Sequence, residues 1–349
     1  MHPGQLLFAG FQGTEVPDDL AELVRRGRVG GVVLFARNLR DPEQVRGLVG
    51  RLHGLAPAGA PLCVAIDQEG GRVQRLRAPW TEWPPMRALG LRDDLAETGQ
   101  VARALARELA DLGIDLDFAP VVDVDTNPAN PVIGDRSFGR EPERVARHAS
   151  AFVLALQSEG VAACAKHFPG HGDTHEDSHV ALPRVDHPLA RLREIELVPF
   201  RAAARAGVAS MMTAHVLLPC LDASVPATLC APALELLRDE IGYDGLVFSD
   251  DLEMAAVAAR FPPRETTRRA LEAGVDALLV CSRADLRDEV LAELEAQPAA
   301  RLAGPLQRMD ELKRRFAGGR LAREAGPPYA AHRALAARLA GYEPGAAST

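Results

Sequence analysis

The sequence predicts an α/β protein in which eight parallel strands close into a (β/α)8 barrel of the TIM type. Two observations predict this fold. Short apolar runs alternate with stretches of helical periodicity along most of the 349 residues, and polar side chains follow directly after many of the apolar runs. A doubly wound α/β sheet is the alternative arrangement of the same elements.

The apolar runs are too short and too uniformly apolar for strands with one wet face, so each predicts a strand buried on both faces of a parallel sheet. Eight such runs occur, at 6–10, 31–35, 62–66, 116–119, 161–165, 209–213, 245–249 and 277–280. Helical patterns separate them at 41–55, 95–112, 142–159, 189–206, 232–241 and 264–273. Eight βα units in this length are what a TIM barrel requires.

Beyond Cys281 the sequence continues with helical patterns at 285–296, 305–316 and 328–339, followed by a tail rich in Gly, Pro, Ala and Ser. No linker rich in Gly, Ser or Pro divides the chain. We therefore expect one catalytic domain over residues 1–340, a barrel with a C-terminal helical extension, and a flexible tail over 341–349.

Composition narrows the classes of partner. The chain is 47% hydrophobic and 25% charged, which allows a large core, and its net charge of −8 without a basic stripe argues against nucleic acid. Five scattered cysteines are typical of reduced thiols. The first residues do not show the basic segment followed by an apolar segment that is typical of a signal peptide. No apolar run reaches membrane-spanning length. We expect a cytoplasmic monomer without a membrane partner.

Polar residues cluster at the ends of the predicted strands. Those that follow or close a strand are Asp67, Asp123, Asp125, Lys166, His167, Thr213, His215 and Asp250. In a barrel all these ends surround one mouth, which is where active sites of this fold are found. Residues far apart in the sequence therefore converge on one site.

Four histidines recur at every fourth position, at 167, 171, 175 and 179. On a helix they would line one face as metal ligands, but Pro169, Gly170 and Gly172 interrupt any helix there, and neither HExxH nor paired cysteines occur. We therefore expect no metal; histidines of a surface loop remain an alternative. No GxGxxG follows a strand and no GxxxxGK[ST] occurs, so no nucleotide cofactor is expected.

Four segments together resemble the bacterial β-N-acetylhexosaminidases of glycoside hydrolase family 3. The first is Lys166-His167-Phe168-Pro169-Gly170-His171-Gly172, followed by Asp177-Ser178-His179. The others are 66–75 (IDQEGGRVQR), 130–139 (NPVIGDRSFG) and 245–254 (GLVFSDDLEM), so the resemblance extends to about residue 281.

The resemblance implies a role for each site residue. Asp250 would be the nucleophile that attacks the anomeric carbon, and His179 would be the acid/base, with Asp177 as its partner. The residues expected to hold the sugar are Asp67, Arg75, Arg136, Lys166 and His167.

Other interpretations of these residues remain open. Asp250 and Asp251 also fit a role as caps of the next helix, and Arg75 and Arg136 are equally common as loop braces. Asp173 and Glu176 are further candidates for the acid. Trp80 and Trp83 lie outside the motifs, and we interpret them as packing residues.

The resemblance implies an exo-acting, retaining β-N-acetylglucosaminidase. Its substrate would be a small carbohydrate, a peptidoglycan-derived fragment of the GlcNAc-anhydro-MurNAc type, and no cofactor would be needed. The alternatives are a β-N-acetylglucosaminide phosphorylase and a broader β-glucosidase of the same family. A non-catalytic sugar-binding barrel is disfavoured because both the nucleophile and the loop acid are present.

Overall fold

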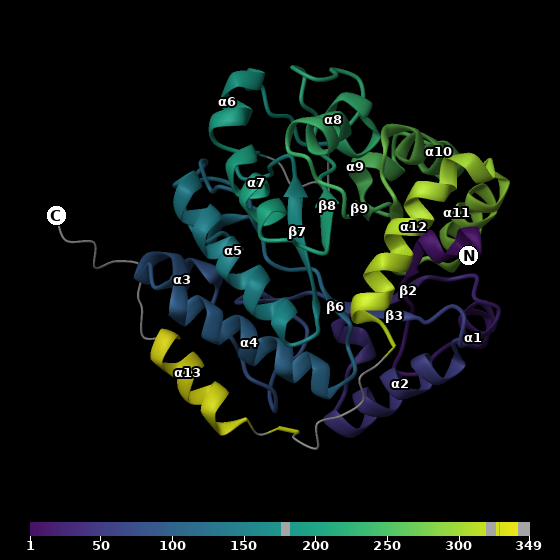
Figure 1. The fold of residues 1–349 in the computed structure, drawn as a ribbon, viewed down its shortest axis with the longest axis horizontal. Helices are drawn as coiled ribbons and strands as arrows, with labels where there is room; N and C mark the ends of the chain where they lie inside the picture. The colour runs from purple at the N-terminus through teal and green to yellow at the C-terminus, as the bar shows by residue number, and fades with distance from the viewer. Residues whose placement is uncertain (176–181, 319–325, 328, 341–349) are drawn as a thin grey trace.

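The computed structural model describes residues 1–175, 182–318, 326–327 and 329–340 (Figure 1). Eight parallel strands form a closed barrel in the order β1-β10-β9-β8-β7-β6-β3-β2. They are β1 (Leu7–Ala9), β2 (Gly31–Leu34), β3 (Cys63–Ile66), β6 (Leu116–Asp117), β7 (Ala162–Phe168), β8 (Ser210–Thr213), β9 (Leu246–Asp251) and β10 (Ala277–Val280). Each lies on one of the predicted apolar runs, so the barrel is confirmed and the doubly wound sheet is excluded.

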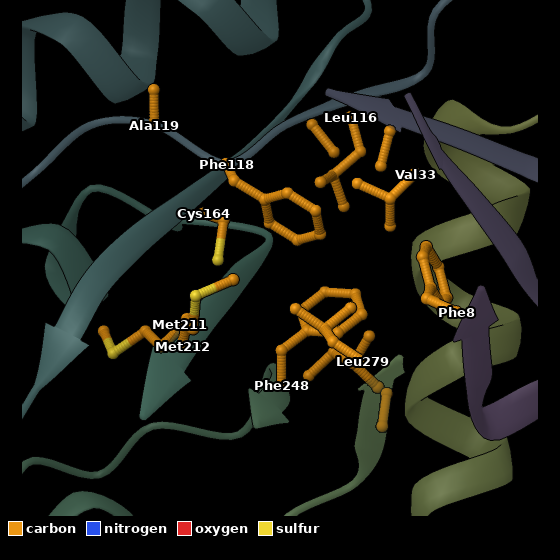
Figure 2. Close-up of a cluster of buried hydrophobic side chains, with 14 of the residues drawn as sticks. Phe8, Val33, Leu116, Phe118, Ala119, Cys164, Met211, Met212, Phe248 and Leu279 are labelled. Atoms are coloured by element: carbon orange, nitrogen blue, oxygen red, sulfur yellow. The ribbon is translucent and has the colours of Figure 1, made fainter. Parts of the chain in front are cut away.

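Side chains fill the interior of the barrel. Figure 2 shows Phe8 of β1, Phe248 of β9 and Phe118, which directly follows β6, among the buried side chains of this interior. The ring of Phe248 packs edge-on against Phe8 at 4.9 Å and against Phe118 at 5.4 Å between ring centroids. All three are buried, so the barrel is a packed core and any cavity must lie at one of its ends.

Helices surround the strands (Figure 1). They are α1 (Asp18–Arg25), α2 (Pro42–Leu55), α3 (Met86–Arg92), α4 (Leu95–Asp111), α5 (Pro142–Ser158), α6 (Leu189–Glu194), α7 (Leu197–Arg205), α8 (Ala231–Glu235), α9 (Ala255–Ala258), α10 (Pro263–Ala273), α11 (Ala284–Ala296), α12 (Ala299–Phe316) and α13 (Ala330–Ala340). The short helices α1, α3 and α9 were not predicted. A two-stranded hairpin, β4 (Gln68–Gly70) with β5 (Val73–Gln74), also emerges from the barrel without having been predicted.

Three predicted helices differ from the structure. The helix expected at 189–206 is two helices, because Pro199 has no N–H to donate to the carbonyl of Ile195 and its ring crowds that carbonyl. The helix expected at 232–241 continues from α8 as a π-helical turn at Leu236–Glu240. The helix expected to start at Pro305 begins earlier, at Ala299, and holds Pro305 inside it.

The C-terminal helices pack back onto the barrel. Lys313 of α12 is only 2% exposed and donates to Gln5 Oε1 at 2.5 Å and to the carbonyl of Pro61 at 2.8 Å. Both acceptors precede strands, so this contact closes the end of the barrel opposite the site. In α13, His332 lies 2.8 Å from Glu108 of α4. The predicted tail 341–349 lies outside the described residues, and none of the described helices has the length and apolarity to cross a membrane.

Candidate active site

A cavity of about 190 Å³ opens at the C-terminal ends of the strands. Six of the eight predicted site residues line it, namely Asp67, Arg75, Arg136, Lys166, His167 and Asp250. The other two, Asp177 and His179, lie outside the described residues. The structure thus brings these six predicted residues together, although Asp67 and Asp250 are 183 positions apart in the sequence (250 − 67).

The end of β7 places two consecutive side chains in the cavity. In a regular strand successive side chains point to opposite faces. Here the pairing of β7 with β8 shifts register between Lys166 and Phe168, and both Lys166 and His167 line the cavity. Such an irregularity re-aims a side chain at the rim of a barrel.

The end of β9 repeats this arrangement with Asp250 and Asp251. Its pairing with β10 is irregular over the same stretch, and both aspartates line the cavity. The backbone N–H of Asp251 donates to Asp250 Oδ1 at 2.8 Å, while Asp251 Oδ1 accepts from the N–H groups of Glu253 and Cys281. Burial raises the pKa of Asp251 to about 7, and the nearby Glu253 carboxylate acts in the same direction.

The helix-capping interpretation of the two aspartates is wrong. Helix α9 begins at Ala255, and its N-cap, Met254, makes no side-chain cap bond. Asp251 instead closes a turn and ties it to the segment after β10. Asp250 is left facing the cavity, with one carboxylate oxygen oriented by a backbone N–H.

Five charged side chains form one network on the other side of the cavity. Lys166 Nζ lies 2.8 Å from Asp67 Oδ1 and 2.7 Å from Glu69 Oε1. Arg75 pairs with Asp67 at 3.0 Å, and Arg136 pairs with both oxygens of Glu69 at 2.8 Å each. Every charge in the network therefore has an opposite charge within hydrogen-bond reach.

The pKa values of Asp67, Glu69 and Lys166 keep these three groups ionised at neutral pH. Burial raises the pKa of Asp67, but Lys166 and Arg75 outweigh burial and hold it well below its usual range. Burial likewise raises the pKa of Glu69, and Arg136 and Lys166 bring it to about 2. Burial lowers the pKa of Lys166, whereas Asp67 and Glu69 raise it above its ordinary value.

Asp123 organises the histidines. Its Oδ2 accepts from the backbone N–H of His167 at 3.1 Å and lies 2.8 Å from His167 Nδ1, and its Oδ1 accepts from the N–H of His171 at 2.7 Å. Burial lowers the pKa of His171 to about 4, and His167 acts in the same direction, so the His171 ring is neutral at pH 7. The Asp123 contact fixes the orientation of the His167 ring.

Asp117 lies beside the charged network but outside the cavity lining. It is fully buried, its Oδ1 accepts from the N–H of Gln68 at 2.9 Å, and its Oδ2 has no hydrogen-bond partner. Burial raises the pKa of Asp117 to about 8, so this carboxyl is protonated at neutral pH. Lys166 opposes this shift, and Asp67 and Glu69 reinforce it.

Three groups in and beside the site were missed from sequence. Glu69 lies inside a motif without an assigned role, Asp123 was noted only as a strand end, and Asp117 falls in an apolar run. Asp123 had a usable signal, because a carboxylate after a buried strand needs a partner.

The structure also tests the alternatives for other residues. Asp173 pairs with His187 and accepts from Thr126 Oγ1 at 2.9 Å, and it does not line the cavity, which disfavours it as the acid. The other alternative, Glu176, lies outside the described residues.

Trp80 and Trp83 are buried and do not line the cavity, so their predicted packing role is confirmed. Within the described part of the chain, no three His, Cys, Asp or Glu side chains are grouped so as to hold a metal ion.

Comparison with known proteins shows which protein family the chain matches. Residues 3–312 match the family described as glycosyl hydrolase family 3 N terminal domain. A beta-hexosaminidase from Thiobacillus denitrificans is 45% identical over 313 residues, covering 87% of this chain and 85% of that protein. A beta-hexosaminidase from Chromobacterium violaceum is 41% identical over 349 residues, covering 97% of this chain and 94% of that protein.

Two solved structures are similar in fold. NagZ from Neisseria gonorrhoeae, in complex with N-trifluoroacetyl-D-glucosamine, superposes with a TM-score of 0.83 at 36% identity, covering 96% of this chain and 98% of that one. A family 3 beta-N-acetylglucosaminidase from Paenibacillus sp. str. FPU-7 gives a TM-score of 0.92 at 41% identity, covering 97% of this chain and 67% of that one.

Proposed function

Since the chain belongs to glycosyl hydrolase family 3 and is a β-N-acetylhexosaminidase, we propose that it is an exo-acting, retaining enzyme that releases terminal β-linked GlcNAc with Asp250 as its nucleophile. One observation carries the proposal. Asp250 projects from the end of β9 into a cavity whose other side holds an ion-paired network with hydrogen-bond donors. A nucleophile facing fixed sugar-binding groups is what such a reaction needs.

The proposed reaction has two steps. Asp250 attacks the anomeric carbon, the glycosidic C–O bond breaks, and His179, oriented by Asp177, gives its proton to the departing oxygen. Water then attacks the anomeric carbon of the glycosyl-Asp250 ester, gives its proton to His179 and releases the carboxylate. Each step inverts the anomeric centre, so the product retains the β configuration.

The sugar would be held by residues of the charged network and by His167. Asp67 would accept from sugar hydroxyls, and Arg75, Arg136, Lys166 and His167 would donate to hydroxyls or to the N-acetyl carbonyl. The ion pairs support this assignment, because they orient the charged groups before the sugar arrives. For the natural substrate we propose fragments of the GlcNAc-anhydro-MurNAc type, on the strength of the family resemblance.

The test is covalent trapping. The protein is incubated with a fluorinated N-acetylglucosaminide inactivator, digested, and the labelled peptide is sequenced by mass spectrometry. A label on Asp250 supports the proposal, whereas a label on Asp251 reassigns the nucleophile to its neighbour. Hydrolysis of a GlcNAc-anhydro-MurNAc disaccharide with and without phosphate then tests the substrate, and a GlcNAc 1-phosphate product would establish phosphorolysis instead.

A further inference from the structure

Glu69 lies at the centre of the charged network and contacts two of the residues proposed to bind the sugar. Its Oε2 accepts from Arg136 Nε and its Oε1 from Arg136 Nη2, both at 2.8 Å, and Lys166 Nζ lies 2.7 Å from Oε1. We propose that Glu69 is a positioning residue, which orients Arg136 and Lys166 for the sugar without binding the sugar itself. This inference rests on the proposed roles of those two cations.

The hydrogen bonds of Glu69 favour positioning over sugar binding. Glu69 lines the cavity together with Lys166, but both of its oxygens already accept from cations, and Oε1 has two of them within reach. Lys166 has three donors and uses two of them on Asp67 and Glu69, which leaves one for a ligand. The cations therefore keep capacity for a sugar, whereas the carboxylate between them has little.

The charge of Glu69 offsets part of the positive charge of the network. Three cations, Arg75, Arg136 and Lys166, share two ionised carboxylates, those of Asp67 and Glu69. Without Glu69, Arg136 loses both of its carboxylate contacts and Lys166 loses one. A buried cation without its partner moves toward water or a new acceptor, so the donors would leave the orientation that they have here.

The backbone fixes Glu69 independently of its salt bridges. It stands on strand β4 of the β4–β5 hairpin, where Gln68 Oε1 accepts from the N–H of Arg75, the residue that follows β5, at 2.9 Å. The turn that follows requires glycine, since Gly70 has a φ of +101° and a Cβ there would approach the carbonyl oxygen of Pro84 to 2.7 Å. A backbone held in this way gives the Glu69 side chain a fixed starting point from which to orient its neighbours.

The experiment compares Glu69→Gln and Glu69→Asp with a matched control, Glu82→Gln. Glu82 is exposed and pairs with Arg77 at 3.3 Å, so the control removes the same charge outside the site. On nitrophenyl β-GlcNAc we expect Glu69→Gln to raise KM about tenfold or more. We expect Glu69→Asp to recover part of that loss, because it keeps the charge, and the control to match wild type. Titration of active sites with the fluorinated inactivator separates misorientation from misfolding, since misfolding lowers the number of sites and leaves KM unchanged.

A double-mutant cycle tests whether Glu69 acts through Arg136. If it does, Glu69→Gln costs much less in an Arg136→Met background than in wild type. An undiminished cost in that background, or a wild-type KM for Glu69→Gln alone, would overturn the inference. Wild-type KM values for both Arg136→Met and Lys166→Met would refute the proposed sugar contacts, and the single variants distinguish that outcome from a failure of Glu69 alone.

Discussion

Asp117→Asn should make the protein more stable at neutral pH and leave it unchanged in acid. The folded-state pKa of Asp117 is about 8, against an ordinary value of 3.8. The folded carboxyl therefore keeps a proton that the unfolded chain releases. Its contribution to stability is complete below the unfolded pKa and is lost as the pH rises toward the folded pKa of about 8.

The size of the effect follows from that difference in pKa. Each pH unit in this window changes the free energy of unfolding by at most about 1.4 kcal/mol, so the interval from about pH 4 to about pH 7 gives an upper limit of about 4 kcal/mol. Relaxation and water penetration around a buried charge reduce such penalties, and we expect about 1 to 2 kcal/mol. Asparagine carries no charge at any pH and keeps the oxygen that accepts from Gln68.

The assay is urea unfolding of wild type and Asp117→Asn at several pH values between about 5 and about 8. Other titrating groups are common to both proteins and cancel in the difference. Asp244→Asn, at an exposed position, serves as the control and should give a flat difference. A difference for Asp117→Asn that does not grow with pH would show that the folded carboxyl is not protonated in this window.

Three other predictions address the chemistry and the packing around it. His179→Ala should lose about 10²–10⁴-fold on a GlcNAc-containing disaccharide and much less on nitrophenyl β-GlcNAc, because nitrophenolate leaves without a proton; equal losses would remove the acid role. If Asp250 is the nucleophile, proton NMR of early product should show the β-anomer, and early α-anomer would refute the covalent step. Gly172→Ala should lower both activity and melting temperature, because its Cβ would come within 1.8 Å of the carbonyl oxygen of Val124. Gly47→Ala, on helix α2 with nothing within 4 Å, should be neutral or stabilise by about 0.5–1 kcal/mol, and similar behaviour of the two variants would contradict the packing argument.

Sequence reasoning recovered the barrel because burial on both faces leaves a strong signal. Apolar runs such as 161–165 contain no polar residue before the mouth of the barrel. The sequence alone therefore predicted both the strand and the position of Lys166 at its end. The helix break near Ile195 was also predictable in principle, since Pro199 removes the donor that a continuous helix needs there.

The remaining features depend on contacts between residues that are far apart in the sequence, and a local sequence pattern does not reveal such contacts. The register shifts that turn both Lys166 and His167, and both Asp250 and Asp251, toward the cavity arise between neighbouring strands. The role of Glu69 depends on Arg136, which follows it by 67 positions. The resemblance supplied the residues that we propose to hold the sugar, but it did not supply Glu69, whose carboxylate pairs with two of them.

Both lysines of the chain are buried, Lys166 at 3% and Lys313 at 2% exposure, while every other basic side chain of the Lys/Arg type is arginine. The folded protein therefore has no lysine on its outer surface, and Lys166 can be reached only through the cavity that it lines. Acylating reagents should modify Lys313 only when the closed end of the barrel opens, whereas a reagent small enough to enter the cavity can reach Lys166 in the folded protein. Neither lysine can meet the surface of a solid support, so immobilisation of the native protein has to use a group other than a lysine side chain.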